Sequence, residues 1–313
     1  MYRIGIDIGG TFVKAGLVAE GGKIVLKSKI PTNIQRPYEQ VFADIANQVK
    51  KLCEDASVPF EKVEMVGVGC PGAITGETGL VCYSNNLGWE NVPIGKCLTE
   101  LLNKPVKVSN DANVAALGEA LYGAGKEYKD IIMLTLGTGV GGGIVIDKKL
   151  YEGNESKGAE LGHAVIVAGG EQCTCGRKGC IEAYSSATAL IRDTKRAMLE
   201  DKDSLMWKRV NGDINAVDGA TSFESEKLGD ASAKKVVDRY VFYLAEAIMN
   251  YCNIFRPQAI VLGGGVCAQG DNLTNRLIEL CEKGHYGYGG TPKVDIVIAK
   301  LQNDAGLLGA SAL

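Results

Sequence analysis

The first thirty residues alternate between short apolar stretches and glycine turns. Residues 2–8, 12–18 and 23–30 are rich in β-branched side chains, and glycine pairs separate them. This alternation is typical of strands joined by tight turns. The pattern therefore predicts an antiparallel meander over residues 2–30.

The next stretch mixes helical and strand periodicity. Apolar residues recur at helical spacing within residues 37–56, from Val41 to Leu52. Further along, the pattern predicts a strand at 63–69, turns throughout 70–89, a short helix over 93–102, a strand at 106–110 and a helix ending near Gly123. Alternating strands and helices indicate an α/β domain.

A second meander begins at Ile131 and follows the same plan as the first. IGIDIGGTFVKAGLV and IMLTLGTGVGGGIVI both read as an apolar strand, a Gly/Thr turn and a second apolar strand. This internal repeat predicts two related halves. Beyond it the pattern predicts helices over 183–254 with a polar loop at 211–230, a strand at 259–265, a helix at 273–281, a strand at 294–299 and a final apolar segment.

Length and charge narrow the class of protein. A chain of 313 residues suits two domains, each with its own core. The net charge of −3 gives no basic surface for nucleic acid, so we expect no nucleic-acid partner. The sequence opens in a strand pattern without a signal core, and no apolar run approaches the roughly 20 residues that span a bilayer. We therefore expect a cytoplasmic protein without a membrane partner.

Three cysteines and one of the two histidines suggest a metal site. Cys173, Cys175 and Cys180 lie in one glycine-containing loop, and His163 precedes it. Together they offer the closed four-ligand set of a structural zinc ion. The alternative is a group of buried or redox-active cysteines that are merely close in sequence.

The turn in the first meander, DIGGT, offers donors to phosphate oxygens. Backbone amides of Gly9 and Gly10, the Thr11 hydroxyl and Lys14 form a concave set, in which a side chain in place of glycine would obstruct the phosphate. Asp7 is positioned to hold Mg²⁺ through water. An ordinary hairpin turn is the alternative.

The turn in the second meander contains Gly137, Thr138 and Gly139 and matches G-x-G-x-x-G. A strand pattern follows it, whereas the dinucleotide fingerprint opens a helix, so we exclude a dinucleotide site. A P-loop motif is also absent from the sequence. Two Gly/Thr turns at equivalent places in two halves indicate phosphates clamped between domains.

Asn110, Asp111 and Asn113 stand where a strand gives way to a helix. Strand ends are the usual location of ligands in α/β domains. We predict that Asp111 is a general base for phosphoryl transfer to a hydroxyl group. Helix capping by Asn110 or Asp111 is the alternative.

Two glutamates lie close to the cysteine loop, Glu160 before it and Glu182 just after it. Carboxylates accept hydrogen bonds from neighbouring hydroxyl groups, so the pair favours a polyhydroxylated substrate. Solvated surface acids are the alternative.

With these motifs in place, the chain resembles the ROK family of sugar kinases and repressors, and within it the bacterial glucokinases. The similarity extends over nearly the whole chain and is carried by DIGGT at 7–11, SNNLGW at 84–89, NDAN at 110–113, LGTGVGGG at 136–143, ELGH at 160–163, the cysteine run at 173–182 and LGGG at 262–265.

The resemblance implies an actin-like ATPase fold of the ribonuclease H-like class, with two related α/β domains and an interdomain cleft. It implies a small N-terminal domain at 1–117, onto which a helix at 304–313 packs. A large domain at 118–303 would carry the zinc loop.

The resemblance also implies roles for individual residues. Asp111 would be the base acting on the sugar 6-hydroxyl, and both Gly/Thr turns would bind ATP phosphates. The implied cofactors are ATP, Mg²⁺ and structural Zn²⁺. The implied sugar contacts are Asn86, Asn110, Glu160, His163 and Glu182, and Gly264 and Gly265 would lie near the adenosine.

The expected function is ATP-dependent phosphorylation of glucose at its 6-hydroxyl. Alternatives are a kinase for N-acetylmannosamine, N-acetylglucosamine or another hexose, and a sugar-sensing regulator without catalysis. Repressors of this family carry an N-terminal DNA-binding domain, whereas the first strand here starts at Tyr2, so we do not expect a repressor. The resemblance suggests a homodimer or homotetramer.

Overall fold

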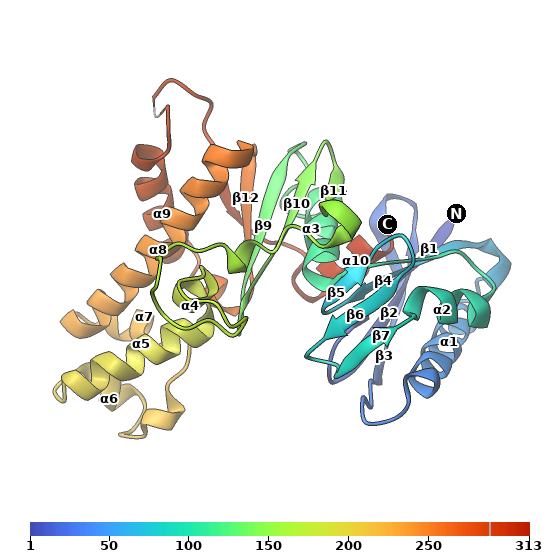
Figure 1. The fold of residues 1–313 in the computed structure, drawn as a ribbon, viewed down its shortest axis with the longest axis horizontal. Coiled ribbons are helices and arrows are strands. Elements are labelled where there is room, and N and C mark those ends of the chain that lie inside the picture. Colours follow the sequence, from blue (N-terminus) through green and yellow to red (C-terminus); the bar gives the residue numbers. More distant parts are fainter. Residues whose placement is uncertain (288) are drawn as a thin grey trace. The chain divides into compact units, whose positions relative to one another are not determined.

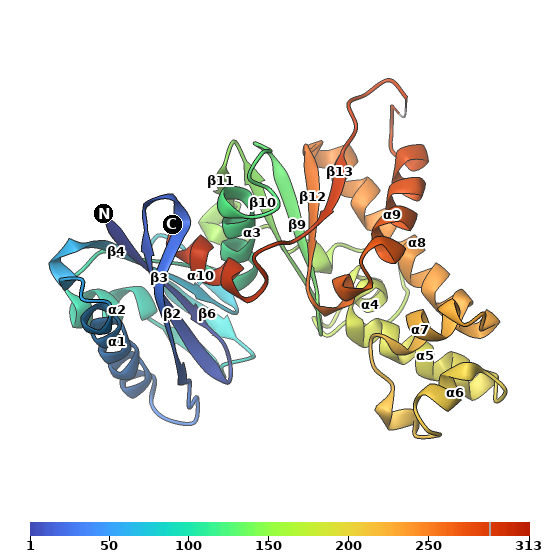
Figure 2. The ribbon, with the colours of Figure 1, turned by 180° about the vertical axis from the view of Figure 1, so that it is seen from behind.

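The computed structural model describes residues 1–287 and 289–313, which form two compact units. Unit 1 consists of Met1–Ile131, Gly143–Ala159 and Ala299–Leu313, and unit 2 consists of Ile132–Gly142 and Glu160–Ile298. Figures 1 and 2 label the elements described below. Because each unit is built from separated stretches, the chain passes between them at four points.

Unit 1 contains a five-stranded sheet with the order β3-β2-β1-β4-β8. Strands β1 to β3 are antiparallel, which confirms the predicted meander, and β4 and β8 continue the sheet in parallel with β1. The strands are β1 (Tyr2–Ile8), β2 (Phe12–Ala19), β3 (Lys23–Pro31), β4 (Val63–Cys70) and β8 (Val106–Asn110).

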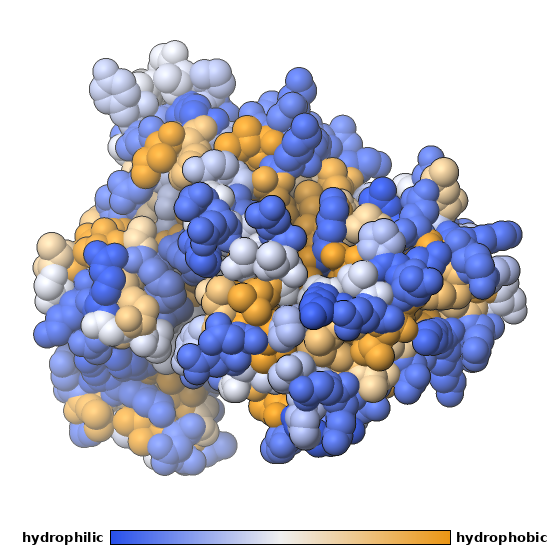
Figure 3. All heavy atoms as spheres, turned by 45° about the vertical axis from the view of Figure 1, so that its right-hand side comes forward, coloured by the Kyte–Doolittle hydropathy of each residue, from blue (hydrophilic) through white to orange (hydrophobic). Residues whose placement is uncertain are grey.

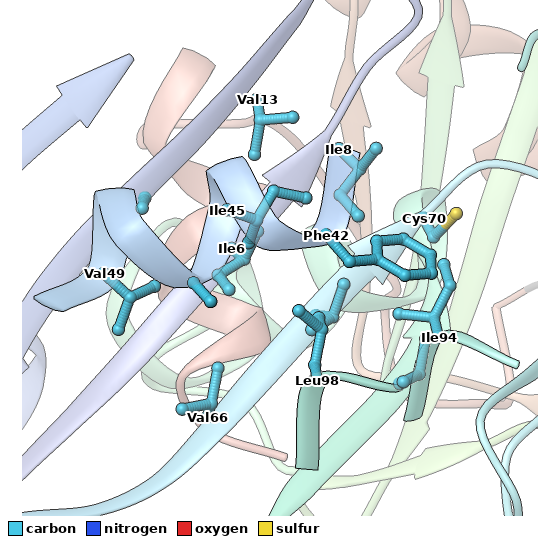
Figure 4. Packing of buried hydrophobic residues seen from close by; sticks show 14 of the residues in the cluster. Ile6, Ile8, Val13, Phe42, Ile45, Val49, Val66, Cys70, Ile94 and Leu98 are labelled. Atoms are coloured by element: carbon cyan, nitrogen blue, oxygen red, sulfur yellow. The ribbon is translucent and has the colours of Figure 1, made fainter. Parts of the chain in front are cut away.

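One face of this sheet is aliphatic and carries the core of unit 1. Alternate residues of β1, such as Ile6 and Ile8, point toward helices α1 (Tyr38–Asp55) and α2 (Ile94–Leu102). Figure 4 shows Phe42 of α1 among Ile8, Cys70 and Ile94. Both helices were predicted, α1 from its apolar spacing and α2 from Pro93 as a helix start, and burial of one helix face provides most of the stability of each.

The opposite face is lined by glycines and lets two helices come unusually close. Helix α10 (Ala305–Ala310) lies on β1 and β4 and also contacts α3 (Asp111–Tyr122). A Cβ added to Gly5 would lie 1.9 Å from the Leu307 carbonyl oxygen, and one added to Gly67 would lie 1.7 Å from the Ala310 oxygen. Glycine is therefore required sterically at this contact.

A small antiparallel sheet, β5-β6-β7, occupies the segment predicted to contain only turns. The prediction for 70–89 was wrong because these strands are short: β5 (Ala73–Thr75), β6 (Leu80–Ser84) and β7 (Trp89–Val92). Strands β5 and β6 each bury one apolar side chain, Ile74 and Val81, and β7 buries two, Trp89 and Val92.

A second five-stranded sheet has the order β11-β10-β9-β12-β13. In both sheets the strands appear in the order third, second, first, fourth and fifth along the chain. This shared topology confirms the two related halves predicted from the repeat. The strands are β9 (Ile131–Leu136), β10 (Val140–Ile146), β11 (Lys149–Tyr151), β12 (Ala259–Gly263) and β13 (Asp295–Ile298).

Helices dominate the rest of unit 2, as predicted. They are α4 (Glu182–Ser185), α5 (Ala187–Glu200), α6 (Leu205–Arg209), α7 (Thr221–Lys227), α8 (Ala231–Phe255) and α9 (Asp271–Gly284). Helix α7 corrects the loop predicted at 211–230. Its polar sequence showed no helical pattern, because the polar residues Thr221, Ser222 and Ser225 are buried beside Phe223. The ring centroid of Phe223 lies 6.3 Å from that of Tyr240 in α8, in an edge-to-face arrangement.

The surface is predominantly polar in the view of Figure 3, where hydrophobic residues form small groups between hydrophilic ones. Within residues 1–287 and 289–313, no helix combines the length and apolar character that crossing a bilayer requires.

Gly67→Ala tests the glycine face. The added methyl would overlap the backbone oxygen of Ala310, so we expect the free energy of unfolding to fall by about 1–3 kcal/mol. Thermal and denaturant unfolding measure the change. Gly219→Ala is the control, because a Cβ there has nothing within 4 Å. Unfolding of Gly67→Ala at the wild-type midpoint would contradict the close contact.

Candidate functional site

The carboxyl ends of β1, β4 and β8 meet at one edge of the unit 1 sheet. The register aligns Asp7 with Gly69, Gly69 with Ser109, and Cys70 with Asn110. Burial, followed by the nearby charges of Asp111 and Asp7, raises the pKa of the Cys70 thiol. Both carboxylates therefore lie close to one buried sulfur at the strand ends.

Asn110 caps helix α3, which is the alternative that the sequence left open. Its side-chain oxygen accepts hydrogen bonds from the backbone N–H of Ala112 (2.8 Å) and Asn113 (3.3 Å). Its amide donates to the carbonyl of Gly72 at 3.1 Å. Asp111 follows as the first helical residue; it is half-buried and accepts from the Ala112 N–H at 2.9 Å. The strand–helix junction is thus fixed by hydrogen bonds on both sides.

The DIGGT turn lies next to the strand ends and against the SNNLGW segment. Gly9 N–H donates to the Phe12 carbonyl at 2.9 Å and closes the hairpin, while Gly10 and Thr11 are exposed. A Cβ on Gly10 would lie 3.2 Å from the carbonyl oxygen of Asn86, so turn and segment are neighbours.

Lys14 and Asp7 form an ion pair on the glycine face of the sheet. Their side chains face each other across β1 and β2, with Nζ 3.2 Å from Oδ2. Both are partly exposed, so the pair contributes little to stability. It places one cation and one anion beside the exposed Gly10 and Thr11.

In unit 2, the Gly137–Gly139 turn is held from two sides. Its backbone carbonyls at Gly137 and Thr138 accept from the N–H of Ala187 (2.8 Å) and the hydroxyl of Thr188 (2.7 Å), at the start of α5. On the other side, the Val140 N–H donates to Glu182 Oε2 at 3.1 Å. These bonds hold the turn rigidly, with Thr138 exposed.

Gly264 brings a second glycine turn to the same place. It adopts a positive φ of 91°, and a Cβ there would lie 2.4 Å from the Leu136 carbonyl oxygen. Gly265 follows, and both are exposed. The two turns of unit 2 are therefore neighbours, although they are far apart in sequence.

The Glu160–His163 segment lies against the start of β10. A Cβ on Gly162 would lie 1.9 Å from the Val140 carbonyl oxygen, and Tyr251 donates to the Leu161 carbonyl at 2.6 Å. Glu160 is exposed and His163 is half-buried.

His163 and the three loop cysteines converge on one point. Their ligand atoms all lie within 4.8 Å of one another. The Cys173 Sγ is 3.6 Å from His163 Nδ1, and Cys175 Sγ is 3.7 Å from Cys180 Sγ. All ten cysteines of the chain are free thiols.

The cluster offers the four ligands of a tetrahedral zinc site, and two of its distances match such a site. Zinc–sulfur bonds of about 2.3 Å place the sulfurs of a tetrahedron about 3.8 Å apart. Burial raises the pKa of the Cys173 thiol, and burial with hydrogen bonds to the other two thiols raises that of Cys180 to about 12. A hydrogen bond from the backbone at Arg177 lowers the pKa of Cys175. A divalent cation would favour the thiolate form of all three.

Glu182 links this cluster to the Gly137–Gly139 turn. While Oε2 accepts from Val140 N–H, Oε1 accepts from the Thr174 hydroxyl at 2.6 Å and from the Cys173 thiol at 3.6 Å. A Cβ on Gly139 would lie 2.3 Å from Oε2, so a larger residue there would displace the Glu182 carboxylate.

The structure thus groups the candidate residues within each unit. Unit 1 gathers those around Asp7 and Asp111, and unit 2 gathers the glycine turns, the metal cluster, Glu160 and Glu182. Sequence reasoning missed Ser109, Glu152 and Thr188. Thr188 follows a serine helix cap, which carried no functional signal, and Glu152 stands alone after a short strand.

The comparisons with known proteins agree along the whole chain. The model of the ROK family matches residues 3–313. A protein of Thermotoga maritima named glucokinase is 38% identical over 312 residues, covering 99% of this chain and 96% of that protein.

Two crystal structures are similar as well. The ROK family glucokinase from Streptomyces griseus, in complex with glucose and AMPPNP, has a TM-score of 0.80 and 32% identity, and covers 100% of this chain and 98% of that one. The ROK hexokinase from Thermus thermophilus has a TM-score of 0.85 and 31% identity, with coverage of 99% and 97%. They confirm the predicted actin-like α/β fold. By sequence and by fold, this chain belongs to the ROK family.

Proposed function

We propose that this protein is an ATP-dependent hexose kinase that phosphorylates glucose at its 6-hydroxyl, with Asp111 as the general base. The observation that carries the proposal is that Asp7, Asn110 and Asp111 lie at the carboxyl ends of β1 and β8, the strands on either side of β4, beside the DIGGT turn. Full-length similarity to proteins named glucokinase supports it.

In unit 1, Asp111 would accept the proton of the attacking hydroxyl. The Asn110 cap and the Ala112 N–H restrict the position of this carboxylate, so it is oriented before the sugar binds. Asn86 and Asn110 would contact the sugar. The exposed Gly10 and Thr11, with Lys14, would donate to phosphate oxygens.

In unit 2, the Gly137–Gly139 turn would donate to phosphate oxygens. Gly264 and Gly265 offer exposed backbone without side chains, where the planar adenine and its ribose would fit. Glu160 and Glu182 would accept hydrogen bonds from sugar hydroxyls, and His163, with Nδ1 on the metal, would donate its Nε2–H to one.

Asp7 is the residue that would hold Mg²⁺, through water, close to the DIGGT turn. The cation would offset the charge of the triphosphate during transfer. The partial exposure of Asp7 leaves room for a hydrated ion, and its Lys14 partner would then be available to a phosphate oxygen.

The substrate test is an ADP-release assay with glucose, mannose, fructose, N-acetylglucosamine and N-acetylmannosamine. We expect the highest kcat/KM for glucose, because the full-length relatives are named glucokinase. A clear preference for an N-acetylhexosamine would refute glucose as the substrate but would agree with the kinase activity. Sugar binding without turnover on any of them would favour a regulator and refute the enzyme.

Asp111→Asn tests the base. Asparagine retains an oxygen for the Ala112 N–H but cannot accept the hydroxyl proton, so kcat should fall by about 10²–10⁴-fold with sugar affinity little changed. Steady-state kinetics and sugar titration measure both. Asp55→Asn, an exposed acid at the end of α1, serves as the control. A kcat within a few fold of wild type would remove Asp111 as base.

We also propose that the His163–cysteine cluster holds one structural zinc ion. Because Glu182 accepts from the Thr174 hydroxyl in the cysteine loop as well as from the Val140 N–H, loss of the metal should disturb the glycine turn as well as the loop. Chelation should therefore lower the unfolding temperature and weaken sugar binding, measured by calorimetry with and without chelator.

Metal analysis provides the direct measurement. We expect about one zinc ion per purified chain, loss of the ion in Cys180→Ser, and retention in the control Cys82→Ser, whose thiol lies in unit 1. Metal-free wild-type protein, with its loop thiols open to a thiol reagent, would count against the zinc site.

A further inference from the structure

Glu152 joins residues on both sides of Asp111, and the proposed mechanism does not use it. Its Oε1 accepts from the Ser109 hydroxyl at 2.5 Å and from the Asn113 amide at 3.4 Å. Ser109 belongs to β8 and Asn113 to the first turn of α3. Asn110 and Asp111 lie between them, so one carboxylate holds both flanks of the strand–helix junction.

Both donors are almost fully buried. Ser109 is 2% exposed and Asn113 is 3% exposed. A buried donor that loses its acceptor is left without a hydrogen-bond partner and without water, and hydrogen bonds to an ionised acceptor are roughly twice as strong as neutral ones. The strand–helix junction therefore depends on the Glu152 carboxylate more strongly than it would on a carboxylate that is fully exposed to solvent.

The same carboxylate also fixes its own segment. Its Oε2 accepts from the Ser156 hydroxyl at 3.5 Å, within the residues that run from β11 to Ala159. The side chain lines a hollow of 490 Å³ in unit 1, which Glu77, Ser109 and Ser156 also line. The hollow gives small molecules access to the carboxylate position.

We propose that Glu152 is a positioning residue for phosphoryl transfer, which holds Asp111 in the orientation that accepts the hydroxyl proton. The inference rests on the proposed kinase function. Glu152 acts through Ser109 and Asn113 and makes no contact with the sugar. Because a misplacement of 1 Å at a reacting group costs about 10²-fold in rate, loss of Glu152 lowers kcat rather than sugar affinity.

The test is the kinetics of Glu152→Ala and Glu152→Gln with the sugar that the wild type phosphorylates. We expect kcat to fall by about 10–100-fold in Glu152→Ala and by less in Glu152→Gln, which keeps one acceptor oxygen. The KM for the sugar should stay within about twofold of the wild-type value. The contacts that bind the sugar equally in the ground state and the transition state are unaffected. Glu77→Ala is the matched control, an exposed carboxylate of the same hollow.

Chemical rescue separates positioning from a general loss of structure. Formate should raise the kcat of Glu152→Ala several-fold, because it places a carboxylate back in the hollow beside Ser109, and should leave Glu77→Ala unchanged. If Glu152→Ala does not fold, Glu152→Gln and Ser109→Ala provide the same kcat-to-KM comparison. The effects of Glu152→Gln and Ser109→Ala on kcat should be non-additive when the two substitutions are combined.

The outcomes distinguish the two proposals. An active wild type with unchanged kcat in the Glu152 variants overturns the positioning role alone. A higher KM with unchanged kcat, or lost activity that formate does not restore, overturns it as well. A wild type inactive on every sugar refutes the kinase function, and the inference falls with it.

Discussion

The close contact between the glycine face and helices α3 and α10 is the constraint on which unit 1 depends. Gly5 and Gly67 let α10 lie directly on the sheet, and the same is true between the helices, since a Cβ on Gly309 would lie 1.6 Å from the Val114 carbonyl oxygen. Backbones that touch cannot slide without overlap. The start of α3, and with it Asp111, is therefore fixed relative to the strand ends that carry Asp7.

Unit 2 reaches a comparable rigidity by other means. Its Gly137–Gly139 turn is held by hydrogen bonds from Thr188 and to Glu182, and Glu182 is held by the cysteine loop. A short loop with few apolar residues has little core of its own, so a bound metal would contribute the order that burial cannot. The metal-bound cysteine cluster would then stabilise the Gly137–Gly139 turn, although no residue of that turn belongs to the cluster.

Periodicity was sufficient to predict the long elements and the repeated topology. Amphipathic α1 and the β1–β3 meander follow directly from the spacing of their apolar residues, and the matched Gly/Thr turns revealed two related halves. Short strands such as β5 (Ala73–Thr75) and the polar helix α7 could not be predicted, because tertiary contacts of single residues such as Ile74 and Phe223 determine them. In the site, motifs indicated Asp111 as a candidate base and predicted the cluster of His163 with three cysteines, which converge in the structure. Glu152 was invisible, since its partners are distant in sequence and belong to other elements.

Helix capping and ligand binding at Asn110 are compatible rather than competing interpretations. The side-chain oxygen is engaged by α3, and the amide is engaged by Gly72, so the junction is stiff before any ligand arrives. The far end of α3 is equally fixed: the fully buried Glu119 accepts from the backbone N–H of Ala124 (2.7 Å) and Leu301 (2.6 Å). A helix held at both ends keeps its first residue in place. An acidic group at that residue would therefore meet a hydroxyl without the reorganisation that a mobile side chain requires.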